Sequence, residues 1–492
     1  MRERVGASIV EIITESLYDK PIVVFREYVQ NSADSLRVAE EDDSTSSLAI
    51  KIWKDQDSLY FLDNGTGIAP EKFASTMGSI ADSAKIKSKN IGYKGIGRLS
   101  GLSYCQKLSF INIVDYQQNR FQTYTIDCQK YAQLRKNGEL NNLQFVDLMK
   151  SISHFEEHPD ASTIKTILSS KDSNSLFEHR NTGFLVILSS ISLVLNAAVD
   201  ERSFLENLSW LLPVPFQEEL LSPGGSDDTH ELFLDLSKAP AFSDDFTMPA
   251  KAFNISYNGN SIKRPITRSL LRDYLCKSNL EQYAVCVHTF SNAGIAINNK
   301  NSFSGIRMYI DNILLCDESE LIPALQQFGM ISHTVNETIQ AVRGIGAIIY
   351  IVDKVNISAN ARRTFIDVTD EDSFNFLKLV GEFVENIFQA RYALSGYYSA
   401  KKKEEVSKNS LDELRKKAED ALIKLARQDI VLEEDPIPKK SFLDLPTADK
   451  RRIIKSKISK DMNARIKRYI DQITDFSLDS YFEDFITWLN AN

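Results

Sequence analysis

Three polar side chains near the amino terminus have the types and the spacing to handle water and a metal ion. Glu27, Asn31 and Asp34 stand at positions i, i+4 and i+7, and a helix with about 3.6 residues per turn places such positions on one face. A carboxylate and an amide directed at one point are suited to orienting a water molecule and ligating a hard cation. Taken alone, a polar stripe of this kind is typical of a solvent-facing helix surface. The rest of the sequence has to decide between these two interpretations.

Two glycine-rich blocks follow and favour the chemical interpretation. They read Asp63-Asn64-Gly65-Thr66-Gly67 and Gly92-Tyr93-Lys94-Gly95-Ile96-Gly97. Glycine has no Cβ, so its backbone tolerates positive φ and its N–H group is able to approach phosphate oxygens closely. A helix expected from about residue 98 would add its positive end to the second block. Each block alone is typical of a turn, but the three segments together predict a nucleotide site.

Several helices and strands must position these segments. Apolar residues recur at intervals of three and four from residue 9 to 39, which predicts two helices separated near Pro21. Alternation over residues 48–52 and 59–62 predicts a β-hairpin that places Asp63 at a strand end. The first unit is completed by a helix beginning at Pro70, a Lys- and Ser-rich loop suited to a lid over residues 83–97, and strands at 107–114, 121–127 and 184–191.

Composition changes divide the rest of the chain. The Pro-, Gly- and Ser-containing stretch at residues 221–228 predicts a linker. After it, strands are expected at 232–236, 253–257, 284–290, 306–315 and 347–352, with a hairpin turn at Asn258-Gly259. Beyond residue 400 the sequence predicts a charged helix at 401–428, a break at 435–438 and a further segment at 448–492. We therefore expect an α+β chain with domains at 1–220 and 221–400 and a helical carboxy-terminal region at 401–492.

Length and composition bound the class of protein. With 492 residues and 43% hydrophobic residues, the chain suits about three domains with buried cores. A net charge of −9 argues against nucleic-acid binding driven by the overall field. The five cysteines are odd in number and form no C-x-x-C pair, which argues against a disulfide framework or a zinc site and favours a reducing, cytoplasmic setting. Neither an export signal nor a membrane-spanning segment is expected.

The three segments, in this order, resemble the ninety-kilodalton heat-shock chaperones within the GHKL superfamily of gyrase, heat-shock chaperone, histidine kinase and MutL ATPases. The likeness extends beyond the segments. Residues 77–85 (MGSIADSAK) are similar to the chaperones' lid sequence LGTIAKSGTK, and residues 91–97 (IGYKGIG) stand where those proteins have IGQFGVG. The resemblance implies a Bergerat-type α/β sandwich that binds ATP with Mg²⁺ and hydrolyses the nucleotide.

The resemblance also implies a role for each matched residue. Glu27 would be the general base that activates water, Asn31 the side-chain ligand of Mg²⁺, and Asp63 the acceptor for the adenine amino group. The glycines would line the adenine and the phosphates, while Asp34 and the two lysines would lie on the site wall and in the lid. The complete binding set is Asn31, Asp34, Asp63, Gly65, Gly67, Lys85, Gly92, Lys94, Gly95, Gly97 and Thr182.

One position departs from the family pattern. The superfamily has a threonine before its last strand, in the pattern GTxVxL, where this chain reads Thr182-Gly183-Phe184-Leu185-Val186. Phe184 occupies the place of that threonine, and Thr182 comes two positions earlier. The polar contact near Asp63 is then either lost, which would weaken nucleotide binding, or supplied by Thr182.

The second unit resembles the chaperones' transducer-like middle domain. Residues 308–312 (MYIDN), 320–323 (ELIP) and 342–344 (VRG) are similar to FIMDN, LIP and VRG. Residues 356–358 (NIS) resemble the start of NISRE, but the arginine pair that follows comes three residues later than the arginine of that pattern. By this resemblance, Arg362 or Arg363 would reach the γ-phosphate once the domains close. Lys354 is the rival, because gyrase-like relatives use a lysine from a comparable loop. The ordinary alternative is an arginine pair that forms salt bridges on a helix start.

Together these features favour an ATP-driven conformational machine that remodels a protein client, with slow Mg-dependent hydrolysis and a homodimer as one expected assembly. Two other functions stay open. One is a DNA-associated GHKL clamp that engages duplex through the basic run at residues 450–468. The other is an ATP-gated scaffold in anti-phage defence or signalling. A sensor histidine kinase is rejected, because all six histidines follow the nucleotide motifs.

Overall fold

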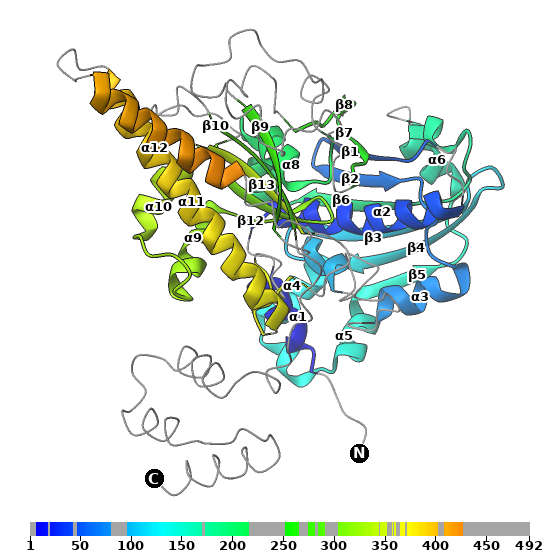
Figure 1. The fold of residues 1–492 in the computed structure, drawn as a ribbon. Helices are drawn as coiled ribbons and strands as arrows, with labels where there is room; N and C mark the ends of the chain where they lie inside the picture. Colours follow the sequence, from blue (N-terminus) through cyan, green and yellow to red (C-terminus); the bar gives the residue numbers. More distant parts are fainter. Residues whose placement is uncertain are drawn as a thin grey trace, which may run out of the picture. The chain divides into compact units, whose positions relative to one another are not determined.

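Two β-sheets, each covered by helices, make up the part of the chain that the structure describes (Figure 1). The predicted α+β class is confirmed. The structure is a computed structural model. It describes residues 6–17, 20–42, 47–79, 96–169, 173–215, 251–264, 274–280, 284–290, 304–343, 345–351, 357, 359–360, 365–369, 371–401 and 408–426.

The first sheet has eight strands in the order β5-β4-β3-β6-β2-β1-β7-β8. Neighbouring strands are antiparallel throughout, except for the parallel pair β1 and β7. The expected hairpin forms β1 and β2 and ends at Asp63. The strands are β1 (Ala49–Asp55), β2 (Ser58–Asp63), β3 (Cys105–Asp115), β4 (Arg120–Asp127), β5 (Ser153–Glu156), β6 (Gly183–Ile191), β7 (Asn254–Tyr257) and β8 (Asn260–Ser261).

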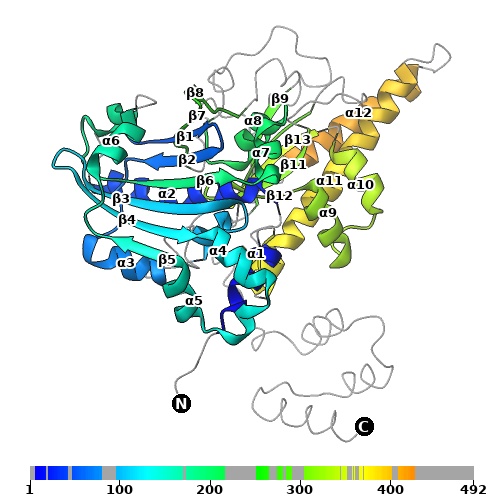
Figure 2. The same ribbon diagram turned by 180° about the vertical axis from the view of Figure 1, so that it is seen from behind.

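Helix α2 (Ile22–Asp42) crosses one face of this sheet, and the strands lie in front of it in the reverse view (Figures 1 and 2). Its apolar residues Phe25, Tyr28 and Val29 are buried against Phe61 and Phe110 of the sheet. The recurrence of apolar residues every three or four positions predicted this amphipathic helix. The same core includes residues of α1 (Ser8–Leu17), α3 (Pro70–Gly78), α4 (Cys128–Lys136), α5 (Phe145–Ile152), α7 (Leu193–Asp200) and α8 (Phe204–Leu211).

A smaller apolar cluster covers the opposite face of the first sheet. It contains Trp53, Leu62 and Leu185 from the strands together with residues of α6 (Ala161–Ser169) and of the short 3₁₀ helix η3 (Ser173–Phe177). The sheet is therefore buried on both faces, and the rigid strand ends are able to fix the polar residues that follow them.

The second sheet has the order β12-β11-β13-β10-β9 and its own apolar core. Helices α11 and α12 pack against each other and contribute Phe376, Val380, Ala418 and Leu425 to that core. The elements are β9 (Tyr274–Leu280), β10 (Ala284–Phe290), β11 (Gly305–Ile310), β12 (Ile313–Asp317), β13 (Ile345–Ile351), α9 (Glu318–Gln327), α10 (Val335–Val342), α11 (Glu371–Lys401) and α12 (Lys408–Ala426).

The structure corrects two sequence-based expectations. The single strand expected at residues 306–315 is wrong: β11 and β12 form a hairpin around Asp311 and Asn312, which both have positive φ. The strand expected at residues 253–257 in the second unit instead joins the first sheet as β7, parallel to β1. The turn at Asn258-Gly259 does form, with positive φ at both residues, and connects β7 to β8.

A buried arginine connects the two sheets. Arg264, which follows β8, is 0% exposed. It donates hydrogen bonds to the Asn312 side chain, to the Asn312 carbonyl at 2.8 Å, to the Tyr350 hydroxyl at 3.1 Å and to the Leu212 carbonyl at 3.1 Å. The guanidinium also lies 4.3 Å from the centre of the Tyr309 ring. Helix α2 reaches the same hairpin, because Arg37 forms an ion pair with Asp311 at 3.3 Å.

Among the described residues, no helix is both long enough and apolar enough to cross a bilayer.

Candidate functional site

Helix α2 places the three predicted polar residues along one side of the site. Glu27 and Asp34 are buried, at 4% and 2% exposure, and Asn31 between them is half-buried. The neighbouring Arg26 is also buried and its Nε lies 3.4 Å from a carboxylate oxygen of Glu27. The polar stripe is thus not a solvent-facing surface, and a buried, ion-paired carboxylate is the kind of group found in reactive sites.

The 3₁₀ helix η1 (Gly97–Gly101) brings the end of the second glycine block against Glu27. A Cβ added to Gly97 would overlap Oε2 of Glu27 and would lie 3.5 Å from the Glu27 Cβ. The backbone of residue 97 is therefore in direct contact with the carboxylate. Only glycine allows this approach without moving the Glu27 side chain.

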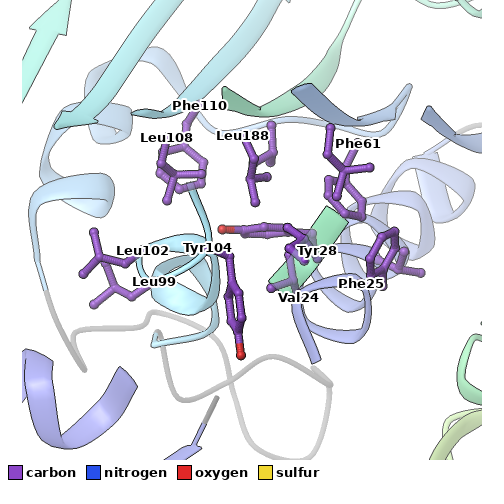
Figure 3. Packing of buried hydrophobic residues seen from close by; sticks show 14 of the residues in the cluster. Val24, Phe25, Tyr28, Phe61, Leu99, Leu102, Tyr104, Leu108, Phe110 and Leu188 are labelled. Atoms are coloured by element: carbon purple, nitrogen blue, oxygen red, sulfur yellow. The ribbon is translucent and has the colours of Figure 1, made fainter. Parts of the chain in front are cut away.

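Tyr28 fixes η1 to helix α2. Its hydroxyl donates to the Arg98 carbonyl at 3.1 Å and accepts from the Gly101 N–H at 3.0 Å. Burial raises the pKa of Tyr28 well above its usual value, so the hydroxyl keeps the proton that it donates. Figure 3 shows the Tyr28 ring among Phe61, Leu188 and Leu99. This packing ties the residue next to Glu27 to both ends of η1.

Asp63 ends β2 and is 2% exposed. One oxygen of its carboxylate accepts a hydrogen bond from the Gly65 N–H at 3.0 Å. The hydrogen bond turns the chain back immediately after the strand, in the manner of an Asx turn. The strand fixes the Asp63 backbone and the turn fixes its side chain, so the carboxylate is held in one orientation.

Two polar residues hold the loop that follows Asp63. Ser35 of α2 accepts from the Gly67 N–H at 3.3 Å, and a Cβ on Gly65 would overlap the Ser35 side chain. Asn112 of β3, which is 1% exposed, accepts from the Ile68 N–H at 3.0 Å and donates to the Ile68 carbonyl at 2.7 Å. The first glycine block is thus fixed between α2 and the sheet.

The structure places both residues of the departure from the family pattern at this end of the site. The Thr182 hydroxyl donates to the Gly65 carbonyl at 2.8 Å. Phe184 is the cross-strand partner of Asp63 in the β2 and β6 register. Its ring lies 6.1 Å from that of Phe73 and 6.4 Å from that of Phe110, in the core beneath the helices. An aromatic ring therefore stands beside the Asp63 carboxylate.

Eight of the predicted site residues lie in the part of the chain that the structure describes. The described residues Glu27, Asn31, Asp34, Asp63, Gly65, Gly67, Gly97 and Thr182 come together along α2 and the adjoining strand ends. The predicted residues Lys85, Gly92, Lys94, Gly95, Lys354, Arg362 and Arg363 lie outside the described residues.

Three supporting residues were missed by the sequence reasoning: Tyr28, Ser35 and Asn112. Asn112 had a visible signal, because it is the one polar residue in the apolar run of residues 110–114. The other two lie on α2 itself, among residues whose pattern explains a helix without them. Their hydrogen bonds join backbone groups that are 32 to 73 positions away in the sequence, so local spacing contains no sign of them.

The two glycine segments contact α2 at opposite ends of the polar face. Gly97 meets Glu27 and Gly65 meets Ser35, eight residues further along, which corresponds to about 12 Å on a helix axis. One end has a buried carboxylate at the half-buried backbone of Gly97, and the other has an oriented carboxylate beside an aromatic ring. Such a site suits an elongated ligand with a hydrogen-bond donor at one end and a reacting anionic group at the other.

Part of the chain is similar to a known protein family. The family described as histidine kinase-, DNA gyrase B-, and HSP90-like ATPase matches residues 20–157. This segment is similar to the ATPase domains of that family. The matched part of the ATPase domain runs from α2 through β5 and therefore contains Glu27, Asn31, Asp63 and both glycine blocks.

Two curated proteins are similar to a part of the chain. The chaperone protein HtpG of Sulfurovum sp. (strain NBC37-1) is 28% identical over 126 residues, which is 21% of this chain and 20% of that protein. The chaperone protein HtpG of Acinetobacter baylyi (strain ATCC 33305 / BD413 / ADP1) is 26% identical over 125 residues, with the same shares. The chain spans about a fifth of the length of these relatives.

Proposed function

We propose that this chain binds ATP along helix α2 and hydrolyses the nucleotide slowly with Mg²⁺ as cofactor. The observation that supports the proposal best is the contact of Gly97 with the buried carboxylate of Glu27. It joins a phosphate-binding type of backbone to a general-base type of side chain. The match to the ATPase family and the likeness to the HtpG chaperones support the same conclusion.

In this proposal the base end of ATP meets Asp63. One of its oxygens accepts from Gly65, and the carboxylate retains capacity to accept from the adenine amino group. The Thr182 hydroxyl donates its hydrogen bond to the Gly65 carbonyl, so Thr182 supports the loop after Asp63. Phe184 then gives the base pocket an apolar wall where the family has a threonine.

The phosphate end meets Glu27, Asn31 and the backbone of η1. Glu27 takes a proton from the attacking water, and Nε of Arg26, 3.4 Å from a carboxylate oxygen of Glu27, helps to hold that side chain in place. Because Glu27 is 4% exposed, water other than the bound molecule is kept from the carboxylate. The two hydrogen bonds of the Tyr28 hydroxyl hold the η1 backbone next to Glu27.

The donor set fits a magnesium ion. Asn31 offers a neutral amide oxygen between two carboxylate-bearing positions of α2, and hard oxygen donors of this kind suit Mg²⁺, which completes its shell with phosphate oxygens and water. Bound there, Mg²⁺ would neutralise charge on the phosphates during transfer. Asp34, Lys85, Gly92, Lys94 and Gly95 remain proposed binding residues, and Lys354, Arg362 and Arg363 remain proposed contacts to the γ-phosphate.

We further propose that nucleotide binding drives a chaperone-like cycle in which a client protein is remodelled, with pairing of two copies as its assembly. The proposal extends to the whole chain the similarity to HtpG, which covers about a fifth of it. The proposed compartment is the reducing cytoplasm, in which the thiols of Cys105, Cys128 and Cys316, all free in the structure, would stay reduced. The proposed domains are 1–220, 221–400 and 401–492 along the chain, with β7 and β8 of the second segment completing the sheet of the first and α12 of the third packing on the core of the second.

A pair of isosteric variants tests the proposed ATPase. Glu27→Gln keeps the shape of the side chain but removes the base, so calorimetry with an unhydrolysable ATP analogue and Mg²⁺ is expected to give the parental Kd while turnover is lost. Asp63→Asn can still accept from Gly65, but its NH₂ group would face the adenine amino group, so binding is expected to weaken by at least about tenfold, or 1.4 kcal/mol.

The two variants serve as controls for each other, since both replace one buried carboxylate with an amide. If Glu27→Gln hydrolyses ATP at the parental rate, the proposed base is wrong. If neither the parent nor any variant gives heat with ATP or its analogue, the proposed nucleotide site is wrong.

A further inference from the structure

Two thiols lie in contact with each other next to the end of η1. Cys105 is the first residue of β3 and Cys128 the first residue of α4. The antiparallel register of β3 and β4 pairs Lys107 with Asp127, which brings the two cysteines together. Their Sγ atoms are 3.8 Å apart. Nothing in the proposed ATPase reaction uses this pair.

An open cavity adjoins both cysteines. It has a volume of about 560 Å³ and its lining includes Cys105, Cys128, Leu102 and Tyr131. The ion pair of Arg135 with Glu11, at 3.0 Å, belongs to the same lining. Cys128 is almost fully buried and Cys105 is half-buried. A small reagent that enters the cavity therefore meets Cys105 first and finds a second thiol next to it.

The contact between the thiols also sets their reactivity. The hydrogen bond between Cys105 and Cys128 is the larger cause, and burial the second, that raise the pKa of the Cys105 thiol well above its usual value. The thiolate is the nucleophile in sulfur chemistry, so oxidation of this pair is expected to be slow near neutral pH and to become faster as the pH rises.

We propose that Cys105 and Cys128 are a modification site at which a two-electron oxidant forms a reversible disulfide. The sulfurs have to approach by a little under 2 Å, from 3.8 Å to a bond length of about 2.05 Å. With a diazene oxidant, both S–H bonds break, one S–S bond forms, and the two hydrogens and two electrons reduce the N=N group to a hydrazine. With hydrogen peroxide the same two hydrogens and electrons leave as part of two water molecules.

The disulfide would change a contact that supports the catalytic end of the site, a step that rests on the proposed function. The Cys105 Sγ donates to the Gly101 carbonyl at 3.3 Å, and the Gly101 N–H donates to the Tyr28 hydroxyl at 3.0 Å. Oxidation removes the S–H group that donates to the Gly101 carbonyl. Gly101 is the last residue of η1, and the first residue, Gly97, contacts Glu27. We therefore expect the oxidised chain to hydrolyse ATP several-fold more slowly.

The test counts thiols in the full chain before and after oxidation. The protein is incubated with diamide, quenched with acid, unfolded and labelled with N-ethylmaleimide, and its mass is measured. The reduced chain has five cysteines to label. We expect the oxidised chain to lose two adducts, both from the peptides of Cys105 and Cys128, with full recovery after dithiothreitol and faster loss at higher pH.

Matched variants decide the assignment. Cys128→Ala and Cys128→Ser are expected to keep all of their thiols under diamide and to show no change in turnover on oxidation. Cys316→Ala, which removes a buried cysteine of the second sheet, is expected to lose two adducts as the parent does. Persistence of labelled Cys105 and Cys128 in the parent, or pairing of either with another cysteine, would overturn the proposal.

Turnover separates this proposal from the ATPase proposal. If the parent hydrolyses no ATP in either state, the ATPase proposal fails while the thiol count still decides the disulfide. If the disulfide forms and turnover is unchanged, the proposed link through Gly101 is wrong.

Discussion

Replacing Gly97 with alanine would test the contact on which the proposed hydrolysis depends. Residue 97 has negative φ and opens a 3₁₀ helix, so alanine fits its backbone. The added methyl group would overlap Oε2 of Glu27. Because that oxygen is at the end of a rotatable side chain, the carboxylate rather than the backbone is expected to move.

The size of the effect follows from the displacement. Ordinary contact with a Cβ begins at 3.4 Å, and the carboxylate has to withdraw by about 1 Å to restore it, a misplacement that costs about 100-fold in rate. This corresponds to about 2.7 kcal/mol in the activation free energy. Stability is expected to change by less than about 1 kcal/mol, since the group that yields is flexible.

The measurement is steady-state ATP turnover combined with urea unfolding. Gly396→Ala is the matched control, because a Cβ there meets no atom within 4 Å and the residue lies inside α11. It is expected to leave turnover unchanged and to raise stability slightly. A Gly97→Ala protein that turns over ATP at the parental rate would show that the position of the Glu27 carboxylate does not limit hydrolysis.

Two further substitutions address neighbouring groups. Tyr28→Phe leaves the Gly101 N–H and the Arg98 carbonyl without the hydroxyl that pairs them, so urea unfolding is expected to show a loss of about 2–3 kcal/mol; a loss below about 0.5 kcal/mol would contradict the role given to this hydroxyl. Phe184→Thr restores a hydroxyl beside Asp63 and is expected to tighten ATP binding in calorimetry by about fivefold, equivalent to one hydrogen bond of about 1 kcal/mol, while the loss of ring packing with Phe73 and Phe110 lowers stability. Unchanged or weaker binding would show that the aromatic ring itself contributes to base recognition.

The parts of the fold that depend on local pattern were predictable. The 3.6-residue recurrence of apolar side chains gave α2 and its polar face, and the alternation on either side of residues 55–58 gave the hairpin that ends at Asp63. The polar residues of the site could be proposed because their types and their order along the chain are visible in the sequence.

The parts that depend on distant pairing were not predictable. Nothing in the residues of β7 states that its partner is β1, about 200 positions earlier, since strand pairing depends on tertiary packing rather than on local sequence. The β11 and β12 hairpin was missed because apolar residues flank Asp311 and Asn312 on both sides, although this polar pair, which has positive φ, is itself a turn signal. Ser35 acts through a hydrogen bond across the fold, so its role could be recognised only once the loop after Asp63 was in place. Asn112 is visible as a polar residue in an apolar run, but its partner Ile68 could not be read from the sequence.

The parallel pairing of β1 with β7 has a consequence for how the protein is made. During synthesis β1 emerges from the ribosome long before residues 254–257, so its outer edge must wait without a partner until more than half of the chain has been translated. Arg264, the buried residue that joins the two sheets, follows directly after this late strand. Until residues 254–257 have been made, the edge of the nascent amino-terminal sheet is open to edge-to-edge association. A protein of this architecture would therefore itself benefit from a chaperone during its synthesis.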